Sequence, residues 1–355
     1  MTFGPKRHPG VGFNQQEEAI WRIQPYHWPI MPEHTVDPLD RKIIAALVVD
    51  GRATWSTIAA ALGEAERTVA RRGSRLLESG MVEIRGMADP HRTADSDPFI
   101  VHGRCRPDST LTAAVALAHR PESVTVYVLS GPQHCYADIW APRRRQSRLF
   151  LQEMATPSGF LQMDISPVLE YIRTLHDWEP GILTVTQTAE IRRIPKTRWP
   201  QFTDPVVLDR EDKALVRLVV ENGRASFEEL SRLVGISEQT VKRRIDKMRQ
   251  SGLLTFRAVF DPALIGLPVA ALLWIRAKPS KVSAVAEALA AQPFLRYAAI
   301  IMGAHQIVAD FRLPSKEALR ELMLEAEWLE HVDLLESSLI LETLKQSRVL
   351  AGDLG

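Results

Sequence analysis

Three stretches in the second half of the chain place apolar residues at the 3.6-residue spacing of a helix. Leu215, Leu218 and Val219 mark the first stretch, which ends at the turn sequence NGRAS. Ser226 is followed three residues later by Glu229, which is the spacing of a capping box, so a short second helix is expected to begin there. The pattern therefore predicts two helices joined by a polar turn.

A third helix is expected after Gly235, with Ser237 as its N-cap. Its apolar positions recur at i, i+4 and i+7 and form one buried stripe of Val241, Ile245 and Met248. Its opposite face is polar and basic and carries Gln239, Arg243 and Lys247. The next residues, LLTFRAVF, have the composition of a strand and would form a wing. This order predicts a winged helix-turn-helix whose third helix enters the major groove of DNA.

The same pattern occurs earlier in the chain, because Gly51 and Gly223 are 172 positions apart and their surroundings match. DGRAT aligns with NGRAS, and TVARR aligns with TVKRR. In the first copy Thr54 is the expected cap, Gly63 is the turn, and Val69 lies on the buried stripe with Leu76. The exposed stripe of its third helix is Arg67, Arg71 and Arg75.

Charge strengthens this interpretation. The whole chain has a net charge of only +1, which does not suit a protein that coats nucleic acid along its full surface. Residues 65–75 contain four arginines and one acid, and residues 237–249 contain five basic residues and two acids. The sequence therefore predicts two local and equivalent basic surfaces.

From residue 268 the second copy follows the order βαββαβ, which is a ferredoxin-like plan. Its strands PVAALLWIRA and LRYAAIIM are apolar on the face that the helices leave open, so a partner sheet is expected. The 172-residue offset continues here, because Gly131 aligns with Gly303 and Asp138 with Asp310. The first copy is thus expected to contain the same domain.

These patterns together predict an α+β protein with two tandem copies of a winged helix-turn-helix plus a ferredoxin-like domain. The expected boundaries are an N-terminal arm at 1–35, a degenerate first winged helix-turn-helix at 36–88, a first ferredoxin-like effector and dimerisation domain at 89–177, a linker at 178–206, a second winged helix-turn-helix at 207–258 and a second ferredoxin-like domain at 259–350. Four prolines in the linker argue against a long helix there.

The composition is that of a globular protein, with 45% hydrophobic and 25% charged residues. No apolar run is long enough to span a bilayer and no signal peptide is evident, so a cytoplasmic protein without membrane partners is expected. Cys105 and Cys135 could form one bridge at most, and reduced thiols are expected. Nothing in the sequence indicates a cofactor.

The order of helix-turn-helix, wing and βαββαβ domain, with DGR or NGR after the first helix and a glycine hairpin before the third strand, resembles the Lrp/AsnC (feast/famine) transcription regulators. The resemblance covers about 36–177 and 207–350, as in a double-length, tandem version of that family. It implies that the ferredoxin-like (RAM-type) domains pair through their sheets. It also implies that a small-molecule effector, often an amino acid, binds between paired domains near the glycine hairpin.

The hairpins depart from the family's usual Gly-x-x-Asp. Gln306 and His134 stand at the acid's position, and Asp310 and Asp138 lie four residues further on. An acid suits an ammonium group, whereas Gln or His offers mixed donors and acceptors, so this departure argues against an ordinary amino acid as the effector. From the resemblance, an amino acid or a related metabolite is expected. The candidate effector residues are Gly303, His305, Gln306, Asp310, Gly131, His134 and Asp138. A tight turn with solvated polar side chains is the plainer alternative.

The partner proposed for the two third helices is double-stranded DNA, read by one chain acting as a pseudo-dimer or by a homo-oligomer of it. The candidate DNA contacts are Ser237, Gln239, Thr240, Lys242, Arg243, Arg244, Lys247, Arg67, Thr68, Arg71, Arg72 and Arg75. Among the arginines, Arg72, Arg244 and Arg249 are expected to contact phosphates. The sequence leaves open whether the ferredoxin-like domains pair within or between chains.

The sequence also offers candidates for three other kinds of site. A metabolite sensor or a tetrapyrrole decarboxylase-like enzyme on the same scaffold would place His134 or His305 at its centre. A zinc site is disfavoured, because the spacing of His102 and Cys105 on a strand points them to opposite faces. The cluster PRRRQSR at 142–148 is either a solvated surface or an anion clamp.

One position departs from the repeat. Gly73 stands in the middle of the first copy's third helix where the second copy has the buried Ile245, and Ala65 replaces the cap Ser237. Two explanations remain open. Either the first copy has lost packing and is the softer one, or a bulky side chain from the N-terminal arm, such as Trp21 or Trp28, fills the space.

Overall fold

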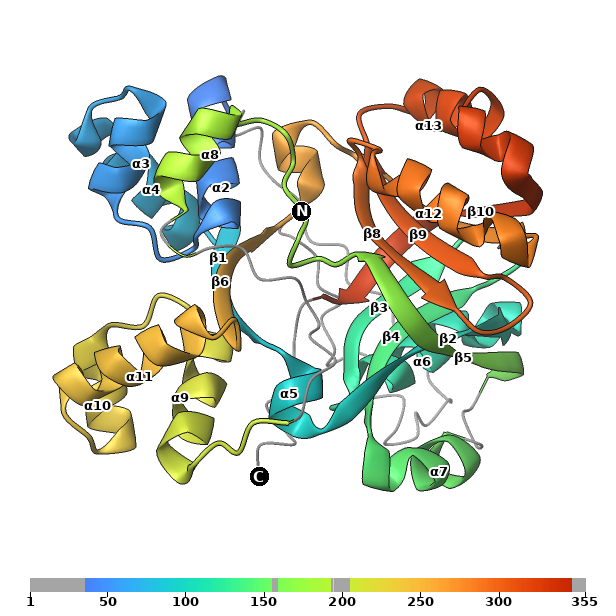
Figure 1. Ribbon diagram of the computed structural model, residues 1–355, viewed down its shortest axis with the longest axis horizontal. Helices are drawn as coiled ribbons and strands as arrows, with labels where there is room; N and C mark the ends of the chain where they lie inside the picture. The colour runs from blue at the N-terminus through green and yellow to red at the C-terminus, as the bar shows by residue number, and fades with distance from the viewer. Residues whose placement is uncertain (1–35, 155–158, 193, 195–204, 347–355) are drawn as a thin grey trace, which may run out of the picture.

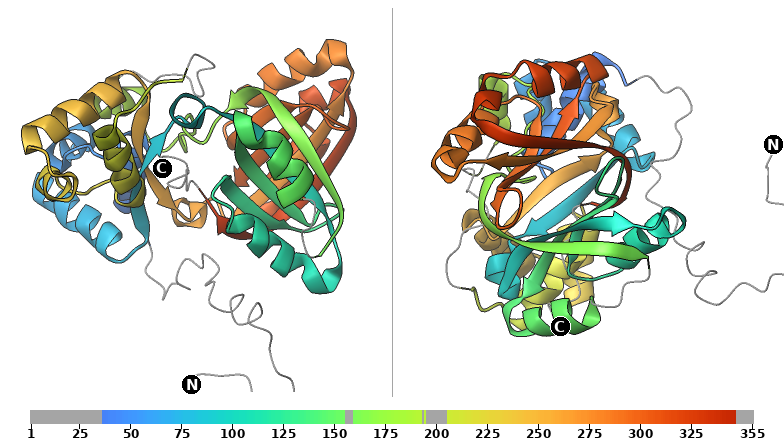
Figure 2. Two further views of the ribbon diagram at one scale, coloured as in Figure 1. Left: turned by 90° about the horizontal axis from the view of Figure 1, so that it is seen from below. Right: turned by 90° about the vertical axis from the view of Figure 1, so that its right-hand side faces the viewer.

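The computed structural model describes residues 36–154, 159–192, 194 and 205–346, so the predicted N-terminal arm lies outside the described residues. Two lobes lie side by side (Figures 1 and 2). One lobe contains both helix-turn-helix units, and the other contains a closed β-barrel with helices on its outside. The predicted α+β class is confirmed, with its two helix-turn-helix units and its two ferredoxin-like halves.

Each helix-turn-helix unit has three helices that begin and end where the capping residues predict. The first unit consists of α2 (Pro38–Val49), α3 (Trp55–Leu62) and α4 (Glu66–Glu78), and the second of α9 (Arg210–Glu221), α10 (Phe227–Val234) and α11 (Glu238–Gln250). Thr54, Ser226 and Ser237 accept backbone N–H bonds as N-caps, whereas Ala65 offers no side-chain cap. The turns at Gly63 and Gly235 have φ of 69° and 78°, a left-handed conformation that favours glycine.

The strand predicted as a wing forms in both copies, but it pairs differently from a wing. Strand β1 (Val82–Ala88) pairs antiparallel with β6 (Leu254–Phe260) of the other copy, and the two make a separate two-stranded sheet. Among the described residues neither unit has a second strand of its own beside the first, and the two strands pair with each other. The ribbon therefore joins the two units instead of extending each one (Figure 1).

The two ferredoxin-like halves close one barrel within a single chain, which answers the question that the sequence left open. The strand order is β10-β3-β4-β2-β5-β8-β9-β7. The first half supplies β2 (Ser96–Cys105), β3 (Ser123–Leu129), β4 (Cys135–Pro142) and β5 (Phe160–Arg173), and the second supplies β7 (Val269–Ala277), β8 (Leu295–Ile301), β9 (Ile307–Leu313) and β10 (Val332–Lys345). The long strands β5 and β10 cross to the other half, pairing with β8 and β3.

The outer faces of the barrel are covered by helices, and the inner faces meet in an aromatic core. Helices α6 (Thr110–Ala118) and α7 (Gln146–Arg148) lie on the first half, and α12 (Val282–Ala290) and α13 (Lys316–Leu324) lie on the second (Figure 1). The core inside the barrel includes Tyr127, Tyr136, Trp274 and Tyr297. The apolar open faces predicted from the sequence are thus buried against each other.

Two short helices complete the connections between the lobes. Helix α5 (Pro90–Ala94) follows β1 and leads into β2, and α8 (Val185–Ile191) lies in the linker and packs on α2 and α3 of the first unit. Ile191 of α8 is fully buried in the core of the helix-turn-helix lobe. In the part of the chain that the structure describes, no helix is long and apolar enough to cross a membrane.

Candidate DNA-reading helices and barrel interior

The two helix-turn-helix units are related by a pseudo-two-fold axis that passes through the β1–β6 ribbon. Arg85 lies opposite Arg257 in the register, and these two residues are themselves equivalents in the internal repeat. An antiparallel pair of strands that is centred on equivalent residues has a two-fold axis through its centre. The helices α4 and α11 therefore occupy equivalent positions on the two sides of the ribbon.

The arginines of DGR and NGR hold the two units together by a reciprocal exchange. Arg52 donates to the carbonyls of Gly223 and Ala225, and its guanidinium lies 4.7 Å from the ring centroid of Phe256. Burial, together with the nearby charges of Arg249 and Arg224, lowers the pKa of Arg52 to about 10. The bonds to carbonyl oxygens suit a cation held in this place.

Arg224 repeats the arrangement from the other side. It donates to the carbonyls of Gly51 and Ala53 at 3.0 Å each, and its guanidinium stacks 4.3 Å from the ring centroid of Trp55. The DGR and NGR motifs do not by themselves indicate this role. Their appearance at the same place in both copies was the signal that could have identified a symmetric contact.

The exposed faces of α4 and α11 carry the predicted reading residues. Arg67, Arg71, Gln239, Lys242, Arg243 and Lys247 are exposed, whereas Thr68 and Thr240 are half-buried. Ser237 accepts the N–H of Thr240 at 3.2 Å as the cap of α11. These exposed side chains keep their donors available to a partner.

The arginines expected to contact phosphate form ion pairs within the chain. Arg72 forms ion pairs with Asp37 and Asp40, and its repeat equivalent Arg244 forms ion pairs with Asp209 and Asp212. In each copy the third helix is thereby tied to the start of the first helix. The hydrogen bonds that Arg244 donates to Asp209 and to Asp212 raise the pKa of Arg244.

Two further arginines are engaged in the same way. Arg75 lies 2.6 Å from the buried carboxylate of Asp40, although half of its side chain remains exposed. Arg249 pairs at 2.8 Å with Asp50 of the other unit and is only 17% exposed. Helical periodicity showed which face these residues occupy but not the acids that lie across from them.

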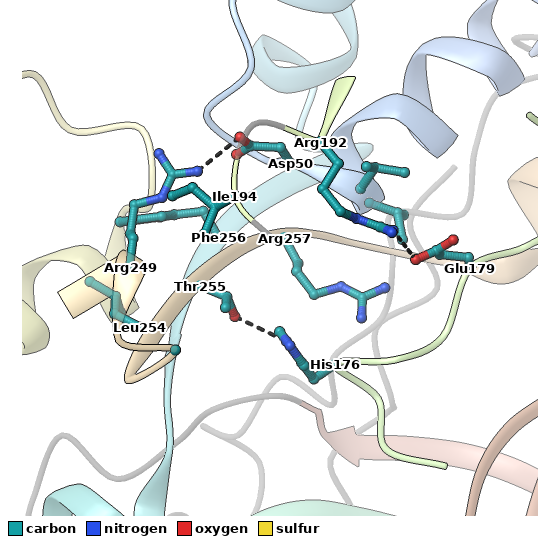
Figure 3. Close-up of a pocket in the computed structure, with 13 residues that line it drawn as sticks. Asp50, His176, Glu179, Arg192, Ile194, Arg249, Leu254, Thr255, Phe256 and Arg257 are labelled. Carbon is teal, nitrogen blue, oxygen red and sulfur yellow. Dashed lines mark hydrogen bonds and ion pairs between the residues drawn. The ribbon is translucent and has the colours of Figure 1, made fainter. Parts of the chain in front are cut away.

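A pocket of about 70 Å³ lies at the seam between the two units and the linker (Figure 3). The Arg249–Asp50 pair borders one side, and the ion pair between Arg192 and Glu179 borders another. His176 Nδ1 lies 3.2 Å from Thr255 Oγ1 of β6, so the segment after β5 contacts the ribbon directly. Two ion pairs formed within the chain therefore border this pocket.

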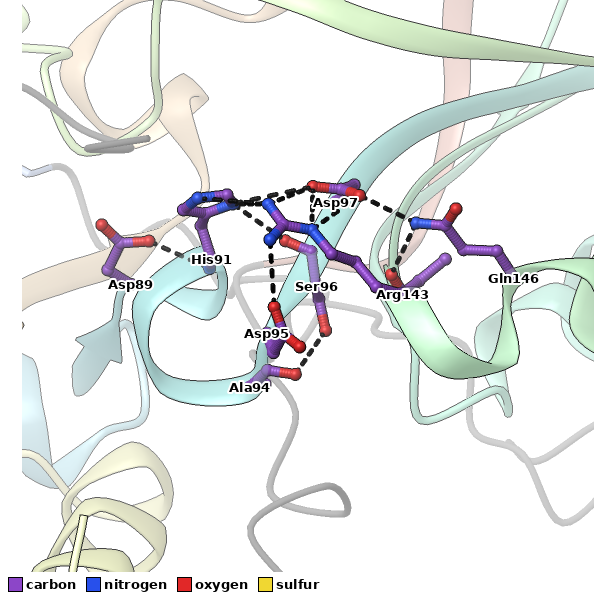
Figure 4. Close-up of polar contacts among 9 residues, drawn as sticks. Asp89, His91, Ala94, Asp95, Ser96, Asp97, Arg143 and Gln146 are labelled. Atoms are coloured by element: carbon purple, nitrogen blue, oxygen red, sulfur yellow. Dashed lines mark hydrogen bonds and ion pairs between the residues drawn. The ribbon is translucent and has the colours of Figure 1, made fainter. Parts of the chain in front are cut away.

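The arginine cluster after β4 is largely paired within the chain. Arg143 contacts Asp97 at 3.0 Å and Asp95 at 3.2 Å, and Gln146 donates to the other oxygen of Asp97 (Figure 4). His91 of α5 lies beside the same group. These contacts fasten α5 to the barrel. Of the cluster, Arg144 is exposed, while Arg145 and Arg148 pair with Glu153.

The glycine hairpins lie at the contact between the two halves of the barrel, but their polar side chains close the turns. His134 Nδ1 lies 3.0 Å from the backbone N of Cys105, and Gln306 Oε1 accepts the N–H of Ala277, which is the equivalent bond in the other half. His305 lies 3.4 Å from Glu336. A Cβ on Gly131 would lie 3.3 Å from Ser338 Oγ, and one on Gly303 would lie 3.1 Å from Ser166 Oγ.

The candidate zinc residues divide between two environments. The ring of His102 lies against Trp274 inside the barrel, with centroids 4.3 Å apart. Cys105 and Cys135 are buried free thiols with their sulfurs 3.6 Å apart, in the outer core beneath α6. Among the described residues no group of three metal-ligating side chains gathers.

The two equivalent aspartates inside the barrel have opposite surroundings. Asp310 pairs with Arg312 and Arg296, and the hydroxyl of Tyr127 donates to it at 2.9 Å. Asp138 is as buried as Asp310, yet its Oδ1 has no hydrogen-bond partner among the described residues. Burial raises the pKa of Asp138 to about 7. Both aspartates are among the predicted effector residues, and of the two only Asp310 has its charge matched by described side chains.

A cavity of about 50 Å³ opens beside Asp138. It lies at the end of the barrel that faces the helix-turn-helix lobe, because Met87 of β1 and residues 174–176 after β5 also border it. The aromatic side chains that line it are Trp140, Tyr171 and Tyr297. The rings of Trp140 and Tyr171 are nearly parallel, at 9°, with centroids 6.3 Å apart.

Comparison with known structures supports the architecture. The siroheme decarboxylase NirDL, solved with an iron-uroporphyrin III analogue, superposes with a TM-score of 0.58, and the likeness covers 88% of this chain and 94% of that chain. The sequences are 13% identical. At this identity the likeness establishes a shared tandem fold.

Comparison with known sequences identifies the family. The model of the AsnC-type helix-turn-helix domain matches twice, at residues 36–77 and 208–249. An uncharacterized HTH-type transcriptional regulator of Pyrococcus horikoshii is 34% identical over 121 residues, which are 34% of this chain and 77% of the relative. The HTH-type transcriptional regulator FL11 of the same organism is 29% identical over 146 residues, covering 41% of this chain and 97% of FL11. The chain belongs to the AsnC-type (Lrp/AsnC) family of helix-turn-helix transcription regulators, in a double-length form.

Proposed function

We propose that this protein is a sequence-specific DNA-binding regulator in which α4 and α11 each read one half-site. One observation carries the proposal. Two equivalent helices, tied across a pseudo-two-fold axis by Arg52, Arg224 and the β1–β6 ribbon, each present an exposed basic face. A two-fold arrangement of reading helices suits an inverted repeat in DNA.

The two half-sites should differ in sequence. The first helix offers Arg67 and Arg71, which favour guanine, whereas the second offers Gln239 beside Arg243, which suits adenine next to guanine. An imperfect palindrome is therefore the expected operator. The phosphate contacts come from the lysines Lys242 and Lys247 and from the backbone at the helix N-termini, because Arg72 and Arg244 are held by acids.

Selection of bound DNA from a random pool tests this proposal, with the mass of the complex measured in parallel. An enriched imperfect palindrome bound by one chain, or by a symmetric multiple of it, would support it. A pool that stays random after repeated rounds at physiological salt would contradict sequence-specific binding. Salt must be held constant, because phosphate contacts alone give affinity that falls steeply with salt.

The second part of the proposal is that a small molecule bound in the barrel modulates DNA binding. The cavity beside Asp138 touches both the barrel and β1, so its occupant would contact the element that joins the reading helices. Thermal denaturation with a panel of amino acids and related metabolites tests for such an effector. Stabilisation by none of them would count against it.

A tetrapyrrole decarboxylase-like enzyme remains a separate hypothesis. Its candidate groups are engaged in this structure, since His134 closes a hairpin and His305 lies beside Glu336. Pockets for drug-sized ligands have about 300–1,000 Å³, so the barrel would have to open to admit a macrocycle. Absorbance bands on adding a tetrapyrrole, together with the absence of salt-sensitive DNA binding, would favour the enzyme.

A further inference from the structure

The internal repeat supplies a comparison between two versions of one site. Asp138 and Asp310 are equivalent residues on β4 and β9, and both are buried between the two halves of the barrel. Beside Asp310 stand two guanidinium groups, from Arg296 and Arg312. The second half of the chain thus supplies its own cation to this carboxylate.

The first half lacks that cation. The positions equivalent to Arg296 and Arg312 are Val124 and Trp140, and both line the cavity beside Asp138. The space that guanidinium groups occupy next to Asp310 is therefore matched by a cavity next to Asp138. A buried carboxylate without a partner is costly, and a cation placed in the cavity would relieve that cost.

The walls of the cavity suit an organic cation better than a bare metal ion. Trp140 and Tyr171 lie nearly parallel, and Tyr297 meets Tyr171 edge-on at 73° with ring centroids 5.8 Å apart. The faces of such rings carry negative potential and attract ammonium and guanidinium groups. One water needs about 10–15 Å³ of such space, so a cavity of about 50 Å³ admits a small head group.

We infer that the cavity beside Asp138 binds the head group of a small organic cation, an ammonium or a guanidinium, between Asp138 and the rings of Trp140 and Tyr171. The inference rests on the proposed function for its regulatory meaning, because it names the chemical class of the effector. The rest of the ligand extends toward Met87 and residues 174–176, which also border the cavity. Binding there places the ligand against the strand that pairs with β6.

Calorimetric titration of the full chain at pH 8, without DNA, tests the inference. The probes are the chlorides of ethylammonium, tetramethylammonium and methylguanidinium, with sodium chloride at equal ionic strength and neutral acetamide as references. We expect saturable binding of at least one organic cation, with one site per chain, and none of acetamide. Asp138→Asn, which keeps the shape and removes the charge, should weaken binding at least about tenfold, in keeping with the loss of a charge-assisted contact.

Two further variants sharpen the result. Asp333→Asn removes an exposed acid on β10 and should leave cation binding unchanged. Val124→Arg introduces the arginine that the second half carries at position 296, so it should abolish binding of the probes. This variant also serves if Asp138→Asn does not fold.

Binding that is equal in the wild type, Asp138→Asn and Val124→Arg would overturn the inference, and so would the absence of saturable binding by all three probes. DNA affinity is measured separately on the same preparations. Loss of specific DNA binding with intact cation binding would contradict the proposed function alone, whereas intact DNA binding without cation binding would contradict the cavity alone.

Discussion

At the scale of single residues, Gly73 makes room for a neighbour. A Cβ at this position would lie 2.4 Å from the ring of Trp55, the first residue of α3. The second copy has Phe227 and Ile245 at the equivalent positions. The first copy therefore combines the larger ring of Trp with a glycine, and the second copy combines the smaller ring of Phe with a branched isoleucine. The space beside Gly73 is therefore filled from within the unit, by Trp55, whereas the alternative candidates Trp21 and Trp28 lie outside the described residues.

Gly73→Ile should destabilise the first unit by roughly 1 to 2 kcal/mol. Overpacking costs about 1–3 kcal/mol, and removing a mid-helix glycine returns up to about 1 kcal/mol. Thermal denaturation gives the measurement. The double variant Trp55→Phe with Gly73→Ile recreates the second copy's pair and should recover much of the loss, whereas no recovery would mean that Trp55 is not the obstacle.

Asp138 should make stability fall as the pH rises. Its pKa is raised from the usual value near 3.8 to about 7 by burial, so the folded chain holds a proton that the unfolded chain releases above pH 4. The contribution of this group to the free energy of unfolding is complete below pH 4 and is lost as the pH rises toward 7. At about 1.36 kcal/mol for each pH unit, the total loss is roughly 4 kcal/mol.

Denaturation of the wild type and Asp138→Asn between pH 4 and pH 8.5 measures this loss as a difference. The variant should gain relative stability as the pH rises, and a constant difference would contradict the assignment. The ionisable groups facing Asp138 are Tyr136, Tyr171, Tyr297 and His176. Burial raises the pKa of each of the three tyrosines well above its usual value, so they stay neutral in this range.

At the scale of elements, two adjacent arginines on α11 should behave differently. Arg243 is exposed, whereas Arg244 is tied to Asp209 and Asp212 of α9. Arg243→Ala should weaken specific DNA binding by about 1–3 kcal/mol with little change in stability, because it removes a base contact. Arg244→Ala should lower thermal stability by about 1 kcal/mol.

Fluorescence anisotropy with the selected operator and thermal denaturation provide the two measurements. Arg104→Ala, an exposed arginine on the barrel strand β2, is the control for loss of one positive charge. Equal effects of Arg243→Ala and Arg104→Ala on affinity would leave only a nonspecific electrostatic role for Arg243.

The elements also show what a sequence can and cannot predict. Helices and caps were predicted well, because the apolar period and residues such as Thr54 and Ser237 act locally. The pairing of β1 with β6 was not, since a strand pattern tells which face is buried but not which strand lies beside it. For the same reason the sequence pattern did not predict the ion pairs of Arg72 and Arg244. The aspartates that they contact, Asp37 and Asp209, are equivalent in the repeat, and this equivalence could have indicated the pairs.

At the scale of the whole molecule, the barrel closes within one chain, and this determines how unfolding should depend on concentration. Strands β5 and β10 pair with the opposite half through backbone hydrogen bonds of the same polypeptide. The midpoint of thermal denaturation should therefore stay constant over a hundredfold range of protein concentration. A midpoint that rises with concentration would show that contacts between chains contribute to the fold.

The reciprocal hydrogen bonds of Arg52 and Arg224 should hold α4 and α11 at a fixed distance and orientation relative to each other. Arg52→Ala removes two charge-assisted bonds to carbonyls of the other unit, each worth about 1.5–3 kcal/mol. We expect faster proteolysis of the helix-turn-helix lobe and weaker binding to the full operator, with an unchanged affinity for an isolated half-site. Equal losses on both DNAs would mean that Arg52 acts within its own unit.

Joining the halves in one polypeptide has an evolutionary consequence. In a homodimer every substitution appears twice about the axis, so a carboxylate cannot be neutralised on one side and left open on the other. Here Arg296 and Arg312 stand beside Asp310 alone, and Val124 and Trp140 stand at the equivalent positions beside Asp138. Duplication thus released the two aspartates from identical selection, so that one could become part of the scaffold while the other stayed free to meet a ligand.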